Sequence, residues 1–281
     1  MSSYTLYHLI IGKSSKPTLF LGYPKRKLLN TFFLSYNMDI MLYQNERLDY
    51  LECKDLQIIQ DKSGYTFTTD AVLLANYIKA YAQERLLDFG SGSGVIPILC
   101  SAKTTAKELV GLELQQRLAD MATRSVRLNN LSPRVKIVQG DIKDAPTLFG
   151  AGTFDVVTSN PPYRTFEGDK NGVSEETICR REVYITIDEL MESAGKVLKY
   201  GGRMYCVYKA ERLTDLLVAM RSHGIEPKSL TMVQPKASKP PDTVIVEGKK
   251  GAKAGILIKK PLVIYDETGV YTPQAKKIYG K

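Results

Sequence analysis

LLDFGSGSGV, residues 86–95, is the most informative stretch of this 281-residue chain. An apolar run with the composition of a strand leads into Gly90, Gly92 and Gly94, and a second apolar run with helical character follows. Glycines between a strand and a helix let the backbone approach a ligand closely at the carboxyl end of the strand. The spacing is G-S-G-S-G rather than G-x-G-x-x-G, so no pyrophosphate cradle at the helix terminus is required.

Strands and helices alternate beyond this turn. The sequence predicts strands at 84–89, 108–113, 135–140, 154–159 and 203–208, and helices at 94–102, 115–130, 186–198 and 210–224. This alternation is typical of βαβ units, so we expect an α/β protein with a doubly wound, mostly parallel sheet. Short strands at 229–234, 243–248 and 255–260, joined by basic, Pro-rich loops, predict an antiparallel edge at the C-terminal end of the sheet.

The chain before the sheet predicts a different organisation. From about residue 48 we expect a short helix, a strand hairpin around Ser63-Gly64, and a helix that Thr69 and Asp70 cap at its N-terminus. The helix at 186–198 is expected to end at Gly201-Gly202.

These patterns divide the chain into two parts. Residues 1–37 show no clear hydrophobic period and are expected to be a disordered extension or an over-long start-site assignment. Residues 38–281 are expected to form a single domain, with 38–80 as an N-terminal hairpin and helix cap and 228–281 as basic C-terminal strands.

Charge is unevenly distributed along the chain. The net charge is +9, and residues 1–37 hold five Lys or Arg and no acidic residue. Residues 228–281 hold eleven basic and four acidic residues, which leaves the centre mildly acidic at −3. This favours a polyanion that docks beside a site that is not itself strongly basic, but lysines that only keep the surface soluble explain it equally well.

Composition excludes several classes. No run of about 18 apolar residues exists, so we expect no membrane span. The four cysteines form no CxxC pair and no cluster with histidine, so we expect no metal site and a reducing, cytoplasmic location. The cysteines are Cys53, Cys100, Cys179 and Cys206.

Two carboxylates follow the next two predicted strands. Glu113 ends the second strand, about 20 residues beyond the glycines, where an acidic side chain accepts hydrogen bonds from ribose hydroxyls. Asp141 ends the third strand, where a carboxylate can accept a hydrogen bond from an adenine amino group. Each has a simpler interpretation: Glu113 as a solvated helix start, and Asp141 as a helix N-cap.

Glycines, a ribose-binding acid and an adenine-binding acid over three successive strand ends resemble the class I S-adenosylmethionine-dependent methyltransferases. The resemblance implies a Rossmann-like fold and S-adenosylmethionine as cofactor. The cofactor-binding residues that we expect on this basis are Thr69, Asp70, Asp88, Gly90, Gly92, Gly94, Glu113, Asp141, Ile142 and Asn160.

TSNPPY, residues 158–163, follows the fourth strand and resembles the loop of enzymes that methylate planar, amide-like or exocyclic nitrogens. The lone pair of such a nitrogen is delocalised, so the nitrogen is a poor nucleophile. The Asn160 side-chain oxygen and the Pro161 carbonyl can each accept one N–H and stabilise the charge that develops on the nitrogen. Pro161 and Pro162 keep the loop rigid, and Tyr163 offers a ring on which a base can stack.

Several other interpretations of this loop compete. The simplest is a turn after a strand with a packing tyrosine. Cytosine-C5 methylation needs a nucleophilic cysteine, which the loop lacks. Adenine-N6 enzymes and glutamine-N5 enzymes that act on release factors share this motif, whereas guanine-N2 enzymes usually carry Phe at the aromatic position. A catalytically idle RNA-binding module is the remaining class.

Further stretches narrow the resemblance. ERLDYLECKDLQIIQ and GYTFTTDAVLLANYI, residues 46–60 and 64–78, look like the bacterial family of tRNA-Val adenine-37 N6-methyltransferases. ICRREVYITIDEL at 178–190 and the basic stretch 235–265 continue the resemblance, which covers roughly residues 41–281. It implies adenine 37 of tRNA-Val as the substrate, with glutamine N5 of a release factor as the alternative.

The resemblance also places residues around the substrate. It implies that Thr69 and Asp70 lie over the methionine end of the cofactor, as a lid as well as a helix cap. Arg180 and Arg181 are either phosphate contacts or a solvated helix start. Lysines expected in loops between the late strands are candidates for contacts to the tRNA backbone: Lys236, Lys239, Lys249, Lys250 and Lys253.

Overall fold

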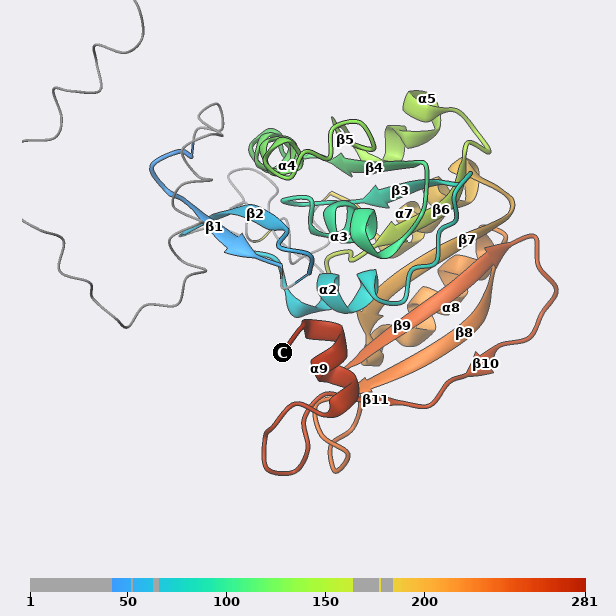
Figure 1. The fold of residues 1–281 in the computed structure, drawn as a ribbon. Helices are drawn as coiled ribbons and strands as arrows, with labels where there is room; N and C mark the ends of the chain where they lie inside the picture. The colour runs from blue at the N-terminus through green and yellow to red at the C-terminus, as the bar shows by residue number, and fades with distance from the viewer. Residues whose placement is uncertain (1–41, 52, 63–65, 164–176, 178–183) are drawn as a thin grey trace, which may run out of the picture. The chain divides into compact units, whose positions relative to one another are not determined.

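The computed structural model describes residues 42–51, 53–62, 66–163, 177 and 184–281. The predictions for residues 1–37, for a turn at Ser63-Gly64, and for Arg180 and Arg181 fall wholly or partly outside this set. Within it, the protein is built on one large β-sheet with helices on both faces (Figure 1).

The central sheet has nine strands in the described part of the chain. Eight follow the spatial order β10-β8-β9-β7-β6-β3-β4-β5, and β11 pairs with the end of β8. The strands from β3 to β7 are parallel, and β9 runs antiparallel between β7 and β8. The bounds are β3 Arg85–Phe89, β4 Glu108–Glu113, β5 Val135–Gln139, β6 Phe154–Ser159, β7 Leu198–Lys209, β8 Ile225–Gln234, β9 Thr243–Lys250, β10 Leu257–Ile258 and β11 Leu262–Val263.

Alternate residues of the parallel strands pack on opposite faces of the sheet. Leu86 belongs to a core with α2 and α3, whereas its neighbour Leu87 belongs to a core with α7 and α8. Such continuous apolar strands are expected where a sheet is buried on both faces, and the predicted doubly wound arrangement is confirmed. The helices are α2 Thr69–Ala75, α3 Val95–Lys103, α4 Gln116–Leu128, α5 Ala145–Phe149, α7 Ile187–Val197, α8 Leu213–Ser222 and α9 Pro273–Tyr279.

The N-terminal segment differs from the prediction. A short helix was expected from about residue 48, but Glu46–Tyr50 is strand β1 and pairs antiparallel with β2, Gln57–Asp61. Tyr50 pairs with Gln57, so the two strands are joined within the sequence between these residues. The turn uses positive φ at Lys54 (48°) and Asp55 (58°), where no glycine marks it in the sequence.

Helix α7 also ends earlier than predicted. It stops at Val197, and β7 begins at Leu198, so Gly201-Gly202 lie within the strand. The register of β7 against β6 shifts between Phe154 and Val156, and Gly201 has φ +78°. The glycines therefore accommodate a bulge rather than a helix end.

Buried polar contacts fix the hairpin to α4. The Arg124 guanidinium donates to both oxygens of Glu46, each at 2.6 Å, and both side chains are buried. The Ile59 amide donates to the Ser125 hydroxyl at 2.9 Å. From β2, the Gln60 amide nitrogen donates to the Ser93 hydroxyl of the glycine loop, and its oxygen accepts from the Phe67 amide. The hairpin thus makes hydrogen bonds both to the glycine loop and to the segment that precedes α2.

Candidate active site

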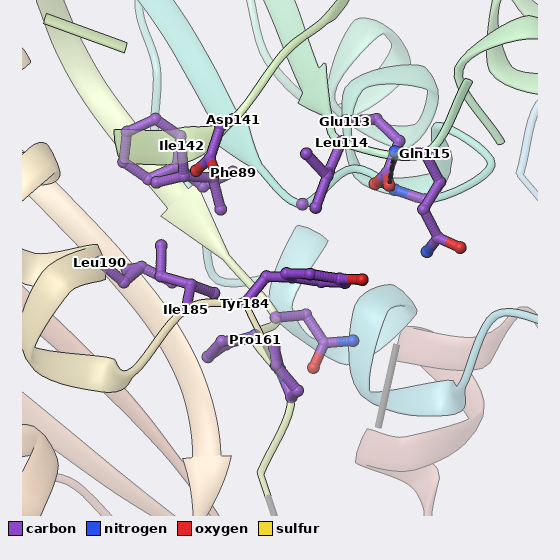
Figure 2. Close-up of a pocket in the computed structure, with 14 residues that line it drawn as sticks. Phe89, Glu113, Leu114, Gln115, Asp141, Ile142, Pro161, Tyr184, Ile185 and Leu190 are labelled. Carbon is purple, nitrogen blue, oxygen red and sulfur yellow. Dashed lines mark hydrogen bonds between the residues drawn. The ribbon is translucent and has the colours of Figure 1, made fainter. Parts of the chain in front are cut away.

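The strands β3, β4, β5 and β6 end side by side, and a pocket lies at these carboxyl ends (Figure 2). We call this side, where the parallel strands end, the pocket edge of the sheet. This is the edge at which open α/β sheets bind ligands. Its lining residues are Phe89, Gly90, Gly92, Glu113, Leu114, Gln115, Asp141, Ile142, Asn160, Pro161, Pro162, Tyr184, Ile185 and Leu190.

The glycine loop forms one wall. Gly90, Gly92 and Gly94 have φ values of +68°, +55° and +89°, which residues other than glycine rarely adopt. A Cβ added at Gly90 would meet no atom within 4 Å, so the pocket approaches the backbone directly at this position. Gly94 differs, because a Cβ there would lie 3.1 Å from Cβ of Ala122 in α4. Gly94 therefore permits close helix packing, and Gly90 leaves space for a ligand.

Glu113 binds the backbone on both sides of the pocket. It is buried at the end of β4, where it accepts from the Gly92 amide at 2.8 Å and from the Gln115 amide at 2.9 Å. It is therefore not a solvated helix start. Glu113 also lines the pocket.

Asp141 both caps a short turn and lines the pocket. It is the N-cap of the 3₁₀ turn Ile142–Asp144 and accepts from the Lys143 amide at 2.9 Å. It also lines the pocket beside Ile142 (Figure 2). The cap holds the carboxylate in place and leaves acceptor capacity for a ligand amino group.

Asp88 does not line the pocket. It is 1% exposed, its Oδ1 accepts from the Thr158 hydroxyl at 2.6 Å, and its Oδ2 has no hydrogen-bond partner. Burial raises the pKa of Asp88 to about 8, partly offset by the Thr158 hydrogen bond. Asp88 lies two residues before Gly90, and a cation nearby would favour the charged form of its carboxylate.

Four side chains from the loop after β6 and from the start of α2 lie in one hydrogen-bonded group. The Tyr163 hydroxyl donates to Oδ2 of Asp70 at 2.8 Å and lies within hydrogen-bond reach of the Asn160 side-chain oxygen. The Asn160 amide nitrogen contacts the Thr68 hydroxyl at 3.5 Å. Residues predicted for catalysis and for the cofactor lid are therefore joined directly.

The start of α2 differs from the prediction that Thr69 and Asp70 cap it. Thr68 occupies the N-cap position, and its side chain makes no cap hydrogen bond. Thr69 and Asp70 lie in the first turn of the helix, and Asp70 binds Tyr163 instead of the backbone.

The Tyr163 ring has cationic and aromatic neighbours. Its ring meets that of Tyr208 edge-on, with centroids 6.0 Å apart. Lys209 Nζ lies 5.3 Å from its centroid, and the Arg212 guanidinium donates to its carbonyl oxygen at 3.1 Å. Lys209 and Arg212 were not predicted from the sequence, because they lie almost 50 residues beyond the loop.

A second, smaller cavity continues from the first. Gly90 and Asn160 line both cavities, while Ser91 and Ser93 line only the second. Asn160 and Gly90 thus lie at the boundary between the two cavities, of which the first holds the two carboxylates and the second the two serines.

Other pocket residues were not predicted. Leu114 and Gln115 follow Glu113 directly, and this adjacency was the available signal. Tyr184 and Ile185 come from the approach to α7, and nothing in their local pattern marks them. In Figure 2 the Tyr184 ring crosses the pocket between Leu114 and Pro161.

The five candidate lysines divide between two edges of the sheet. Lys236 and Lys239 lie in the loop between β8 and β9, at the same edge as the pocket. Lys249 and Lys250 were expected in a loop, but they end strand β9. Lys249 pairs with Arg203 near the start of β7, and Lys253 lies just beyond.

Metal sites and membrane spans are absent from the part of the chain that the structure describes. Among these residues, no group of His, Cys, Asp and Glu has the makings of a metal site, and no helix is long and apolar enough to cross a membrane. Cys100 and Cys206 are buried, and burial raises the pKa of both thiols.

Comparison with known proteins identifies the family. The chain is 26% identical over 237 residues to tRNA1(Val) (adenine(37)-N6)-methyltransferase from Porphyromonas gingivalis, which covers 80% of this chain and 91% of the relative. The enzyme of the same name from Actinobacillus pleuropneumoniae is 26% identical over 226 residues, or 80% of this chain and 93% of the relative. A structure titled as a predicted O-methyltransferase, protein Atu636 from Agrobacterium tumefaciens, shares the fold with a TM-score of 0.61 at 20% identity, over 75% of this chain and 95% of that one. The model of the methyltransferase small domain family matches residues 66–220, more than half of the sequence, and the chain belongs to this family.

Proposed function

We propose that this protein transfers a methyl group from S-adenosylmethionine to N6 of an adenine in tRNA. The observation that carries the proposal is that Asn160, Pro161 and Pro162 line the same pocket as the glycine loop and two carboxylates, with the Tyr163 hydroxyl against Asn160. The names of the relatives from P. gingivalis and A. pleuropneumoniae support tRNA as the substrate and adenine 37 as the position.

The lining residues of the pocket offer groups that suit the chemistry of the cofactor. Open space above Gly90 admits a ligand against the backbone, and Glu113 and Asp141 offer acceptors to ribose hydroxyls and to an adenine amino group. Apolar side chains, including Leu114 and Ile142, line the walls that a base would face. When bound, S-adenosylmethionine supplies an electrophilic methyl group.

Asn160 and Pro161 orient the substrate in this proposal. The Asn160 side-chain oxygen and the Pro161 carbonyl each accept one N–H of the adenine amino group. These hydrogen bonds strengthen as the nitrogen gains positive charge, so they stabilise the transition state more than the ground state. Pro161 and Pro162 restrict the backbone and preserve the geometry.

The basic residues nearest this loop are the first candidates for tRNA contacts. Lys209 and Arg212 contact Tyr163, and Lys236 and Lys239 lie at the same edge of the sheet. Contacts to phosphate give affinity without sequence choice, so the base itself must be selected in the pocket.

The test offers labelled S-adenosylmethionine with two substrates: tRNA from a strain that lacks this enzyme, and a peptide-chain release factor. We expect N6-methyladenosine in the digested tRNA and no label on the release factor. Label on a glutamine of the release factor would show that the loop transfers methyl to an amide nitrogen and that the substrate proposal is wrong.

A variant pair tests the assigned loop. Asn160→Ala should lower kcat at least about a hundredfold, because it removes one transition-state acceptor, while the Kd of S-adenosylmethionine stays within a few-fold. Asn45→Ala, an exposed asparagine in the turn before β1, is the matched control and should keep full activity. Full turnover by Asn160→Ala would contradict the mechanism.

A further inference from the structure

Three tyrosines of the C-terminal segment form an aromatic cluster beside the catalytic loop. The Tyr265 and Tyr271 rings have centroids 4.7 Å apart at 37°, and the Tyr271 and Tyr279 rings have centroids 5.7 Å apart at 48°. The Tyr265 hydroxyl donates to that of Tyr271 at 3.3 Å. The rings are half-buried, so the cluster is not closed core packing.

These rings line a cavity separate from the cofactor pocket. Thr69, Pro235, Asp242 and Ile264 complete its walls, and none of its lining residues lines the cofactor pocket. We call it the tyrosine pocket. It offers tilted aromatic faces, phenolic hydroxyls and one carboxylate, which together suit a flat ring with polar edges.

The tyrosine pocket is held in shape by local contacts. Asp266 accepts from the Thr268 and Val270 amides and so fixes the turn between Tyr265 and Tyr271. Thr272 caps α9, which carries Tyr279, and Asn76, the C-cap of α2, donates to the Ile278 carbonyl at 3.2 Å. Figure 1 shows α9 beside α2.

Its location ties it to the methyl-transfer site. Thr69 lines the tyrosine pocket, and the next residue, Asp70, accepts the hydrogen bond from Tyr163 of the catalytic loop. Pro235 and Asp242 bound the loop that carries Lys236 and Lys239. The tyrosine pocket therefore adjoins both the helix that contacts the catalytic loop and the loop that carries two lysines.

We infer that the tyrosine pocket binds the base of a nucleotide that flanks the target adenosine. This inference rests on the proposed function. Proteins that bind single-stranded RNA stack bases on tyrosine rings and hold the adjacent phosphates with cations, and both elements are present here. The Asp242 carboxylate accepts from an amino or imino group at the edge of the base. Anchoring a neighbour in this way fixes the RNA strand while the target adenosine enters the catalytic pocket.

The first experiment needs no variant. Kd and KM are measured for the wild-type enzyme with anticodon stem-loop RNAs in which one nucleotide at a time around the target is abasic. We expect one flanking abasic site to weaken binding about tenfold, the range for loss of one stacked base. Uniform behaviour of all flanking abasic RNAs would overturn the inference.

The second experiment links that nucleotide to the pocket. Tyr271→Leu should weaken binding of the intact RNA about tenfold and should no longer respond to the sensitive abasic site. Its Kd for S-adenosylmethionine should be unchanged, which shows that the fold is intact. Tyr200→Leu is the matched control, because Tyr200 is 83% exposed at the opposite edge of the sheet. Unchanged RNA affinity of Tyr271→Leu would overturn the inference.

The two proposals fail in different ways. If wild-type enzyme methylates adenine in tRNA but neither the abasic RNAs nor Tyr271→Leu show an effect, only the tyrosine pocket is wrong. If wild-type enzyme neither binds nor methylates RNA, both proposals are wrong.

Discussion

At the scale of single residues, the hydroxyl of Tyr163 affects whether the Asn160 side-chain oxygen is available as a hydrogen-bond acceptor. The Tyr163 hydroxyl faces two oxygens, Oδ2 of Asp70 and the side-chain oxygen of Asn160, but it has one proton to donate. A carboxylate is the stronger acceptor of the two. The Asp70 carboxylate therefore competes with Asn160 for this hydrogen bond and, in the proposed mechanism, makes the Asn160 oxygen more available to a substrate amino group.

This competition makes Asp70 a positioning residue that acts through Tyr163. Asp70→Asn keeps the shape of the side chain and removes its charge, so the Asn160 oxygen is occupied by the phenol proton more often. We expect kcat for tRNA to fall about tenfold, which is about 1.4 kcal/mol, with an unchanged Kd for S-adenosylmethionine. Steady-state kinetics and calorimetry measure the two quantities.

The control for Asp70 is a double-mutant cycle. In a Tyr163→Phe background there is no phenol proton, so Asp70→Asn should then change kcat less than about twofold. A tenfold loss in both backgrounds would show that Asp70 acts by another route. Contact with the cofactor, which the family resemblance implied for Thr69 and Asp70, is that route.

At the scale of elements, a buried ion pair joins the N-terminal hairpin to α4. Arg124 and Glu46 are 8% and 5% exposed, and their contact is bidentate. Burial by itself raises the pKa of Glu46, but hydrogen bonds from Arg124 and from the Tyr43 amide outweigh it, and the pKa is lowered from its ordinary value. Stability from this pair is therefore present above the ordinary pKa of glutamate and is lost as the pH falls through the lowered one.

Removing the arginine leaves a buried carboxylate without its partner. Arg124→Met should lower the free energy of unfolding by about 3–5 kcal/mol at pH 7. The loss should be smaller at pH 4, because Glu46 then takes up a proton. The double variant Glu46→Gln with Arg124→Met should recover most of the lost free energy of unfolding. Urea unfolding at both pH values measures these changes.

A second arginine of the same helix provides the control. Arg127 is exposed, so Arg127→Met should change the free energy of unfolding by no more than about 0.5 kcal/mol. Equal losses for Arg124→Met and Arg127→Met would show that the buried pair does not hold the hairpin.

Elements with a strong local pattern were predicted well. The glycine loop and the strands that end at Glu113 and Ser159 follow from apolar runs with clear stops, and the α/β fold and the methyltransferase family are confirmed. The prediction of a helix was wrong for strand β1, because its buried side chain is the charged Glu46, its apolar Tyr50 is exposed, and its turn uses positive φ without glycine.

Site residues were predictable only where they follow a strand. Glu113, Asp141 and Asn160 end or follow successive parallel strands, and the topology brings them to one pocket. Tyr184 and the contact between Asp70 and Tyr163 join distant segments, and no local pattern encodes such a contact. The roles of these residues toward cofactor and substrate stay predictions.

At the scale of the whole molecule, antiparallel β9 separates the basic residues into two groups. Thr243 pairs with Lys209 at the edge of the sheet where the pocket lies, and Lys249 pairs with Arg203 six residues further along β9. At about 3.3 Å per residue this places Lys249 roughly 20 Å from that edge. Lys236 and Lys250 each donate to a backbone carbonyl, that of Glu267 at 3.0 Å and that of Leu198 at 2.8 Å, so the two groups differ in position rather than in contacts. The C-terminal charge is therefore not one continuous surface.

The separation predicts which lysines bind the tRNA backbone. Lys236→Gln with Lys239→Gln should weaken binding and reduce the salt dependence of log K by about 0.7–0.9 for each phosphate that is no longer neutralised. Lys249→Gln with Lys253→Gln removes the same charge at the far edge and should change neither quantity. Titrations of tRNA from low to high salt measure both. Equal effects of the two pairs would show that tRNA wraps the whole C-terminal segment, because only a ligand that spans both edges responds to both pairs. A change in slope confined to the Lys236 and Lys239 pair would place the RNA backbone over the β8–β9 loop, next to the tyrosine pocket and the Asn160 loop.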